Sequence, residues 1–440
     1  MSRLASILLL LLFAAFIGAP AIAWSWGMSG GGTALQNRAL AKKPAMTAAA
    51  VWDASFGKQF SDWVWDTIPL RDKALKMDHS IDYFVLGDSP SKDALLGKEG
   101  FTWRRERVLA GVRAGGGEPA EMHKALDRIE RAFREADIPV HFSISPTKAS
   151  IYSDYMLDPY RAAYLKIAQP LEDSLRERAK RDPAIIDLWA PMLEEKARLL
   201  ANAGTLARPE LAFLWRKNDD HWNVEAGRIQ AREIVKAIDP ALWDEAKAPT
   251  FDGQFAMQES ELSILYFKLN ILEPYQGFKE SPLVSWSTKN TKVQKSTNPI
   301  QTTRSVATEH NVPSPKNVLV IRDSMLSSHS GHPSVTRDGG VQTIAPFFEK
   351  TVFMHWETLQ QGNRALQPRV RGIDHVVVQV TQGSNYYLVR RASELVDLAR
   401  MIKEGKGQVD DGKDPPVVTP PKMKKLKPKT PAAPVVPVAP

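Results

Sequence analysis

Two short stretches of this sequence carry side chains that could together perform nucleophilic catalysis. In the first stretch, Asp219 stands two residues before His221. In an extended backbone these side chains project to the same side, so the carboxylate can bond the Nδ1–H of the imidazole. The Nε2 atom can then accept a proton from a serine hydroxyl. The same stretch also fits a structural role, in which an aspartate caps a helix beginning near Val224 and His221 is exposed.

The candidate serine follows an apolar run, 318–321, that is typical of a buried strand. Ser324 lies in the turn after it, where a rigid support and the N–H groups of a following helical turn could serve an acyl transfer. We therefore take Ser324 as nucleophile, His221 as base and Asp219 as the partner of His221. An Asp-Ser pair is also an ordinary turn or capping pair, which is the alternative reading.

The elements that would position these residues alternate along the chain. Longer stretches with apolar residues on one face predict helices over 118–136 and 224–238. Short β-branched or aromatic runs predict strands over 83–86, 140–144, 211–215, 318–321, 351–354 and 375–380. This alternation favours an α/β fold with a mostly parallel central sheet, in which reactive groups collect at the carboxyl ends of the strands.

The two ends of the chain differ from its middle. An apolar run over 4–18, shorter than a full membrane span, ends in small residues typical of a signal-peptide cleavage site. We expect 1–23 to be a signal peptide or, alternatively, an uncleaved N-terminal membrane anchor. The expected remainder is a flexible lead-in over 24–45, one folded domain over 46–403 and a disordered Pro- and Lys-rich tail over 404–440.

The composition restricts the chemistry further. The 440 residues include no cysteine, which excludes a disulfide framework, a thiolate metal site and a cysteine nucleophile. With 43% hydrophobic and 25% charged residues, the chain is typical of a globular protein. Its net charge of +8 lies partly in the tail and suits an anionic polymer or lipid head groups. Nucleic acid is not an expected partner for an exported chain.

Several separated stretches, taken in order, resemble one known family over nearly the whole folded region. The 219–222 stretch is similar to an Asp-x-His-Trp motif, and 320–324 is similar to a later strand that delivers a serine. The other similar stretches are 60–63, 68–72, a predicted hairpin that runs from 85–87 through 96–101, and the Pro-Thr-Lys stretch within 144–152. Together they resemble the alginate O-acetyltransferase-like branch of the SGNH hydrolase superfamily.

This resemblance implies a three-layer SGNH-hydrolase-like fold and acetyl transfer to hydroxyls of an alginate-like exopolysaccharide. Ser324 would carry the acetyl group, with His221 and Asp219 in the roles given above and with no metal or cofactor. The implied partners are the polysaccharide acceptor and a membrane-bound acyltransferase that supplies acetyl groups. The implied location is periplasmic, secreted, or anchored to the inner membrane facing the periplasm. The alternatives are a periplasmic carbohydrate acetylesterase and a non-catalytic polysaccharide-binding or assembly protein.

Arg322 departs from the family pattern, which has glycine two residues before the serine. We expect Arg322 either to alter the turn or to offer its charge to an anionic acceptor. Trp222, which with Trp215 flanks the Asp-His pair, is a candidate for sugar contact, although burial is the favoured expectation for both rings. Gln379 and Asn385 are weak candidates for oxyanion donors, since structural roles fit them better.

Three further residues are candidates for other sites, one as a nucleophile and two as metal ligands. Ser89, in a Gly-Asp-Ser stretch, resembles the usual SGNH nucleophile block more than Ser324 does. Because the family resemblance makes this segment part of a hairpin, Ser324 is preferred. His329 and His332 have a spacing found in metal sites, but their Ser- and Gly-rich surroundings favour exposed loop histidines.

Overall fold

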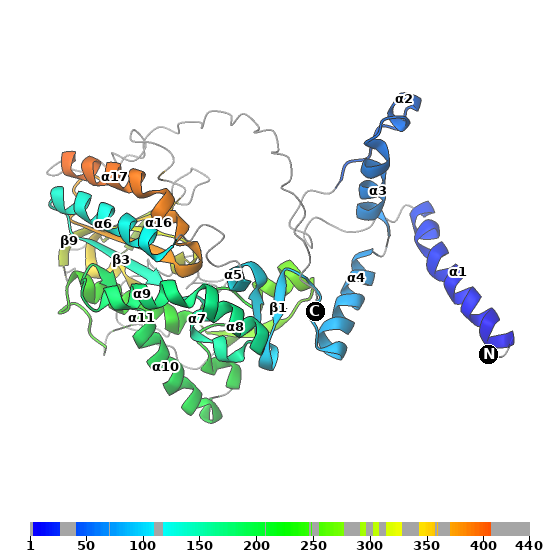
Figure 1. Ribbon diagram of the computed structural model, residues 1–440, viewed down its shortest axis with the longest axis horizontal. Coiled ribbons are helices and arrows are strands. Elements are labelled where there is room, and N and C mark those ends of the chain that lie inside the picture. The colour runs from blue at the N-terminus through cyan, green and yellow to red at the C-terminus, as the bar shows by residue number, and fades with distance from the viewer. Residues whose placement is uncertain are drawn as a thin grey trace.

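A central sheet of seven strands organises the part of the chain that the computed structural model describes (Figure 1). The described residues are 3–26, 41–69, 71–109, 118–206, 208–245, 248, 255–276, 291–295, 302–307, 314–327, 343–356, 359 and 370–405. The strand order is β4-β3-β11-β9-β10-β8-β7. The bounds are β3 Val140–Ser145, β4 Ile185–Ile186, β7 Thr291–Lys295, β8 Thr302–Ala307, β9 Ser314–Arg322, β10 Phe348–His355 and β11 His375–Thr381.

The sheet is parallel through most of its width. Each neighbouring pair from β4 to β10 runs parallel, and only β8 and β7 add antiparallel strands at one edge. Residues Val318 to Ile321 of β9 are fully buried, as expected for a strand covered on both faces. The prediction of an α/β fold with a mostly parallel central sheet is confirmed.

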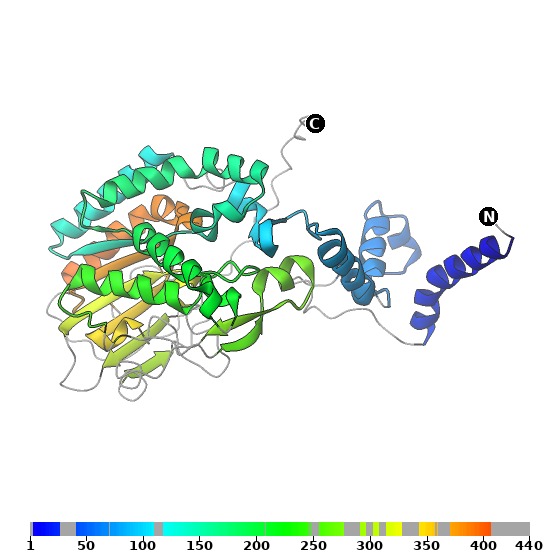
Figure 2. The ribbon, with the colours of Figure 1, turned by 90° about the horizontal axis from the view of Figure 1, so that it is seen from below.

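Helices cover both faces of the sheet, which gives three layers (Figures 1 and 2). α6 (Pro119–Glu135), α16 (Tyr386–Arg390) and α17 (Ala392–Glu404) lie on one side, and α11 (Val224–Ile238) lies on the other. α6 buries Leu126, Ile129 and Phe133 at helical spacing. Gln230 of α11 donates hydrogen bonds to the hydroxyls of Ser143 and Ser145, which fixes α11 against that face of β3.

Most of the other helices come between β3 and α11 in the chain, while α5 precedes β3 and α13 follows β9. Their bounds are α5 Arg105–Leu109, α7 Lys148–Ile151, α8 Asp158–Ile167, α9 Gln169–Ala179, α10 Trp189–Ala201 and α13 Ser324–Ser327. Short 3₁₀ turns are η4 Ser153–Tyr155, η5 Ala203–Thr205, η9 Ala345–Phe347 and η12 Gln382–Ser384. The helices predicted over 118–136 and 224–238 correspond to α6 and α11.

Two antiparallel hairpins stand outside the main sheet and support its carboxyl edge. β1 (Ala94–Leu96) pairs with β2 (Thr102–Arg104) across η3 (Lys98–Gly100). The hairpin predicted from 85–87 through 96–101 is wrong in its first part, because residues 85 and 86 are π-helical and the pairing begins only at Ala94. Gly97 is required in this hairpin because a Cβ there would lie 2.4 Å from the Trp103 ring. β5 (Phe255–Glu259) pairs with β6 (Leu272–Gln276), and the π-helical η7 (Ser263–Phe267) lies between them.

The N-terminal helices project away from the sheet (Figures 1 and 2). They are α1 Arg3–Ser25, α2 Ala48–Val51, α3 Phe56–Thr67 and α4 Arg71–Ser80, followed by η2 Ile81–Leu86. Within the described residues we find no helix whose length and apolar content would let it span a bilayer. Residues 27–40 and 406–440 lie outside the described chain, so the expected division at 23, 45 and 403 stays a prediction.

Two predicted strands are wrong. Residues 83–86 belong to the π-helical η2, where Tyr83 packs on Phe267 while Phe84 to Leu86 are exposed. Residues 211–215 pass from the 3₁₀ turn η6 (Pro209–Ala212) into one isolated bridge between Trp215 and Trp222. Both are short apolar runs, but a short apolar run does not have to pair in a ladder. Residues 211–215 are buried by side-chain packing, whereas 84–86 stay exposed.

Candidate active site

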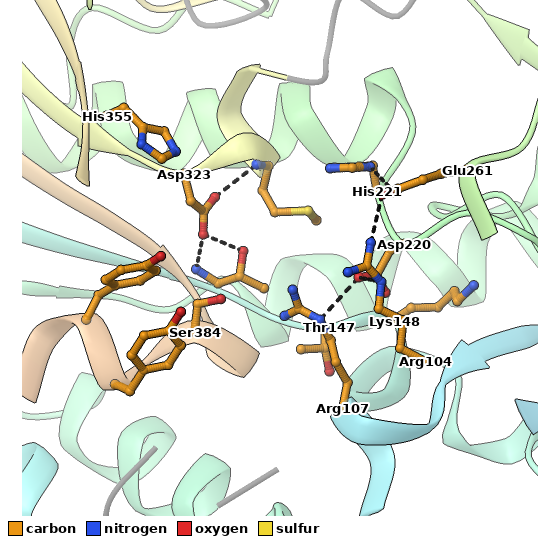
Figure 3. A pocket seen from close by; sticks show the side chains of 14 residues that line it. Arg104, Arg107, Thr147, Lys148, Asp220, His221, Glu261, Asp323, His355 and Ser384 are labelled. Atoms are coloured by element: carbon orange, nitrogen blue, oxygen red, sulfur yellow. Dashed lines mark hydrogen bonds and ion pairs between the residues drawn. The ribbon is translucent and has the colours of Figure 1, made fainter. Parts of the chain in front are cut away.

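A pocket of about 370 Å³ opens at the carboxyl ends of the parallel strands. Thr147, Asp323, His355 and Thr381 line it and come from the ends of β3, β9, β10 and β11. Its other lining residues are Arg104, Arg107, Lys148, Asp220, His221, Glu261, Met325, Ser384, Tyr386 and Tyr387. Asp323 and His355 lie on one side of the pocket, and His221 and Glu261 lie across from them (Figure 3). The position agrees with the expectation that reactive groups collect at this edge.

Asp219 and His221 are in contact, as the spacing predicts. The backbone N–H of His221 donates to Asp219 Oδ1 at 2.9 Å, and His221 Nδ1 lies 3.2 Å from the same oxygen. The backbone is a tight loop, 216–221, rather than an extended strand, and the Asp219 side chain closes it as an Asx turn. Asp220 turns the other way and pairs with Arg104 and Arg107 (Figure 3).

The purely structural explanation of this stretch is not supported. Asn223 is the N-cap of α11, and its side-chain oxygen accepts from the N–H groups of Glu225 and Ala226. Asp219 therefore does not cap the helix. His221 is only partly exposed and faces the pocket rather than bulk solvent.

The buried ammonium of Lys148 holds the 216–221 loop through hydrogen bonds to its backbone. The ammonium donates to the carbonyl oxygens of Lys217 at 2.9 Å and Asp219 at 2.7 Å, and it lies over the Trp103 ring. The side chain is buried, and this burial lowers the pKa of Lys148 to about 8. Buried cations need such partners, so the loop and the lysine constrain each other.

The charges around His221 favour its protonated form. Burial alone would lower the pKa of His221, but Asp219 and Glu261 beside Nδ1 outweigh it and raise the pKa to about 10. Burial would raise the pKa of Asp219, but His221 and the Arg216 guanidinium hold it well below its usual range. His221 and Asp219 therefore form an imidazolium–carboxylate pair at neutral pH.

The opposite side of the pocket is a network of buried hydrogen bonds around Asp323. Its Oδ2 accepts from the N–H and hydroxyl of Thr381, both at 2.7 Å. Its Oδ1 accepts from the Met325 N–H at 2.9 Å and from Gln379 Nε2 at 3.0 Å. Gln379 Oε1 in turn accepts from the Asp323 N–H. This network ties the end of β9 to β11 and holds the turn that carries the serine.

Ser324 is the first residue of α13, directly after Asp323. Its side chain lies outside the described part of the chain, but its neighbours place its backbone. Asp323 and Met325 both line the pocket that His221 lines. Trp222 Nε1 donates to the Met325 carbonyl at 3.0 Å, which joins the histidine loop to the serine turn. The structure thus brings the segments of all three predicted triad residues to one pocket.

The two expected substrate contacts do not match the placement of their side chains. Trp222 is buried against Trp215, with ring centroids 5.6 Å apart, so both tryptophans are core residues. Arg322 is also buried, with its guanidinium 5.9 Å from the centre of the Phe353 ring. Neither Trp222 nor Arg322 lines the pocket, so a substrate site must be built from other residues.

Of the two weak oxyanion candidates, Gln379 has a structural position, because both ends of its amide are hydrogen-bonded to Asp323 and Ser145. Asn385 is fully buried outside the pocket lining, and within the described residues its amide atoms have no hydrogen-bond partner. The Met325 N–H bonds Asp323, so it is not available for an oxyanion in this arrangement.

The rival nucleophile has a structural position as well. The Ser89 hydroxyl donates to the carbonyl oxygens of Ser91 and Ala94, which closes a turn, and Ser89 does not line the pocket with His221. His329 and His332 lie outside the described residues, so their expected exposure stays a prediction.

Asp219, His221 and Glu261 bring three possible metal-binding atoms within 4.8 Å of one another. Both Asp219 oxygens are already engaged, one by His221 and the other by Arg216 and the Glu261 N–H. A cation would have to displace a guanidinium, so the donor set fits a proton-transfer pair better than a metal centre.

Sequence reasoning missed several residues of the site. Glu261 comes from the hairpin of β5 and β6, and Arg104 and Arg107 come from β2 and α5, all far in sequence from His221. No local motif marks them. Lys148 does lie in the Pro-Thr-Lys stretch singled out by the family resemblance, although its clamp on the 216–221 loop was not foreseen.

Comparison with known proteins gives matches only among solved structures. No family model and no curated protein matches the chain. The chain is similar in structure to an O-acetyltransferase domain. That domain is from Pseudomonas putida AlgJ, with a TM-score of 0.38 and 15% identity over 69% of this chain and 99% of that one.

Two other similar structures are Pseudomonas aeruginosa AlgX and Bacillus cereus PatB1 with a sulfonyl adduct. AlgX has a TM-score of 0.39 and 12% identity over 69% of this chain and 66% of that one. PatB1 has a TM-score of 0.41 and 12% identity over 61% of this chain and 93% of that one. Because these three TM-scores are below 0.5, we take the function from this chain's own residues.

Proposed function

We propose that this protein is an O-acetyltransferase that transfers acetyl groups to hydroxyls of an exopolysaccharide. Ser324, His221 and Asp219 are its catalytic triad. The observation that supports the proposal is that the His221 loop and the Ser324 turn both lie at one pocket. The His221 loop and the two neighbours of Ser324 line the same cavity, and Trp222 bonds the backbone of Met325. Such a base beside a serine on a strand end is the arrangement used for acyl transfer.

The reaction would proceed through an acetyl-serine. His221 in its neutral form accepts the proton of the Ser324 hydroxyl while the oxygen attacks the acetyl carbonyl of the donor. The donor's leaving group departs with that proton. A sugar hydroxyl then gives its proton to His221 and attacks the acetyl-serine, which releases the acetylated sugar and returns the proton to Ser324. Asp219 holds Nδ1 of His221 throughout, and no metal or cofactor enters these steps.

The far wall of the pocket supports a sugar acceptor. Tyr386 and Tyr387, at the start of α16, line the pocket, and aromatic rings are the usual platforms for sugar faces. Arg107 pairs through Nε with Asp220 at 3.2 Å and packs against Gly383, where a Cβ would lie 2.4 Å from Nη1. A guanidinium in this place suits the carboxylate of an alginate-like, uronate-containing acceptor.

The proposal includes a periplasmic location and a membrane partner. The N-terminal apolar run is the observation in favour of export, and the basic net charge suits an anionic polymer. A membrane-bound acyltransferase would supply acetyl groups from the inner membrane. Co-purification of such a protein with the full chain from membranes tests this part directly.

The triad is tested by comparing two serines. With an acetyl-ester donor and a uronate oligosaccharide acceptor, we expect Ser324→Ala to lower the transfer rate by at least about 10³-fold. Ser89→Ala is the matched control, because Ser89 only closes a turn outside the pocket. Mass spectrometry should find an acetyl group on the Ser324 peptide of the wild type. Transfer that survives Ser324→Ala but not Ser89→Ala would reverse the assignment.

The same assay separates a transferase from an esterase. A transferase gives acetylated oligosaccharide and slower release of free acetate when acceptor is added. Acetate release that no glycan changes would instead identify a carbohydrate acetylesterase using the same triad. Polymer acetylation in cells that is unchanged by His221→Ala would leave only a binding or assembly role.

A further inference from the structure

His221 faces two carboxylates, although a serine triad needs only one. Glu261 Oε2 lies 2.9 Å from His221 Nδ1, while Asp219 Oδ1 lies 3.2 Å from the same atom. Both carboxylates therefore approach the same ring nitrogen of His221, Nδ1. A single Nδ1–H can bond only one acceptor at a time, so the second carboxylate acts through its charge.

Glu261 is held in this place from three directions. Its Oε1 accepts from Arg104 Nη2 at 2.7 Å. Its backbone N–H donates to Asp219 Oδ2 at 3.2 Å, and the next N–H, of Leu262, donates to the Asn218 carbonyl at 3.0 Å. The carboxylate thus belongs to the hairpin of β5 and β6, and hydrogen bonds tie it to the loop that carries His221.

Charged side chains from several elements surround His221 and the second carboxylate. From its own loop, His221 is faced by Asp219, Asp220 and Arg216, and from β2, α5 and α7 by Arg104, Arg107 and Lys148. Arg216 pairs with Asp219, and Arg107 pairs with Asp220. Arg104 pairs with Asp220 and, through Nη2, with Oε1 of Glu261, so Oε2 is the Glu261 oxygen that faces His221. Lys148 is directed at backbone carbonyls. Asp323 and His355 lie across the pocket (Figure 3).

We propose that Glu261 is a positioning residue that, together with Asp219, holds His221 as an imidazolium in the resting enzyme and so sets the pH at which the triad becomes active. This inference rests on the proposed function for its consequence in turnover. The charge contact itself is a property of the folded chain. The pKa of His221, raised to about 10, agrees with it.

The test measures His221 directly and needs no turnover. Full-length Ser324→Ala protein, labelled with ¹⁵N-histidine, is titrated by NMR, and His221→Asn in the same background assigns the resonance among the nine histidines. We expect Glu261→Gln to lower the titration midpoint of His221 by at least about one pH unit, since it removes a charge within hydrogen-bonding distance. Glu259→Gln, an exposed carboxylate two residues earlier on β5, is the matched control and should leave the midpoint unchanged.

Each outcome decides the proposal. An unmoved midpoint in folded Glu261→Gln overturns it, even if acetyl transfer is found. A lowered midpoint supports it, even if Ser324→Ala proves to have no effect on transfer and the proposed function fails. If Glu261→Gln does not fold, Glu261→Ala is titrated in the same way and judged by the same criterion.

Discussion

The two sides of the pocket are stabilised by different means. The serine side is the end of β9, where Asp323 is saturated by hydrogen bonds from Thr381, Gln379 and Met325. The histidine side is a loop held by charged groups. The Lys148 ammonium bonds the loop backbone, and the carboxylates of Glu261 and Asp219 lie beside His221. Strand ends give a nucleophile a rigid support, whereas a charged loop makes its base responsive to pH. We therefore expect mutations on the two sides to differ in kind.

On the histidine side, the expected effect of a substitution is on activity. Lys148→Met should lower kcat about 100-fold, because the 216–221 loop loses its buried cation and a displacement of about 1 Å at a catalytic group costs on that order. The acetyl-transfer assay measures kcat. Lys196→Met is the matched control, since its ammonium also donates to a backbone carbonyl and lies over an aromatic ring, outside the pocket. An equal loss of kcat in both variants would contradict a specific role of Lys148 in holding the loop.

On the serine side, the expected effect is on stability. Asp323→Asn should lower the free energy of unfolding by about 1–3 kcal/mol, because an amide nitrogen would face donors that now meet a carboxylate oxygen. Urea denaturation of the full chain measures it. Asp397→Asn, on the exposed surface of α17, is the control and should stay within about 0.5 kcal/mol of the wild type. An unchanged free energy for Asp323→Asn would mean that the hydrogen-bond network does not hold this side.

The pH dependence of activity belongs to the histidine side alone. His221 must be neutral to act as a base, and its pKa is raised to about 10, so kcat/KM should rise about tenfold per unit from about pH 6 to pH 8. Burial lowers the pKa of Lys148 to about 8, so the clamp loses its charge above that pH and the rise should flatten. A profile that is flat between about pH 6 and pH 8 would contradict the charged state of His221.

Much of the serine side could be predicted from the sequence. The runs over 318–321, 351–354 and 375–380 are apolar and β-branched, and all three form buried parallel strands. Their order in the sheet places Asp323 and Thr381 at one edge, as parallel strands require. The wrong strands, 83–86 and 211–215, are apolar runs of the same kind that lack a partner strand, and sequence carries no signal for a missing partner.

The histidine side could be predicted only in part. The spacing of Asp219 and His221 predicts their contact because both lie within one short loop. The second carboxylate could not be predicted, since Glu261 reaches His221 from a hairpin about forty residues away and its neighbours follow no catalytic pattern. The position of Trp222 also depends on a distant segment. This candidate sugar contact is instead buried and donates a hydrogen bond to the Met325 carbonyl.

The sequence by itself determined the α/β alternation and the local pairing of Asp219 with His221, because hydrophobic period and short-range hydrogen bonds are properties of adjacent residues. Only the tertiary structure decided that the His221 loop meets the serine turn, that Arg322 is buried, and that Lys148 and Glu261 surround the pair. Those contacts join segments from β2, β3, β5 and β9, and their energies depend on burial and distance, which exist only once the chain has folded.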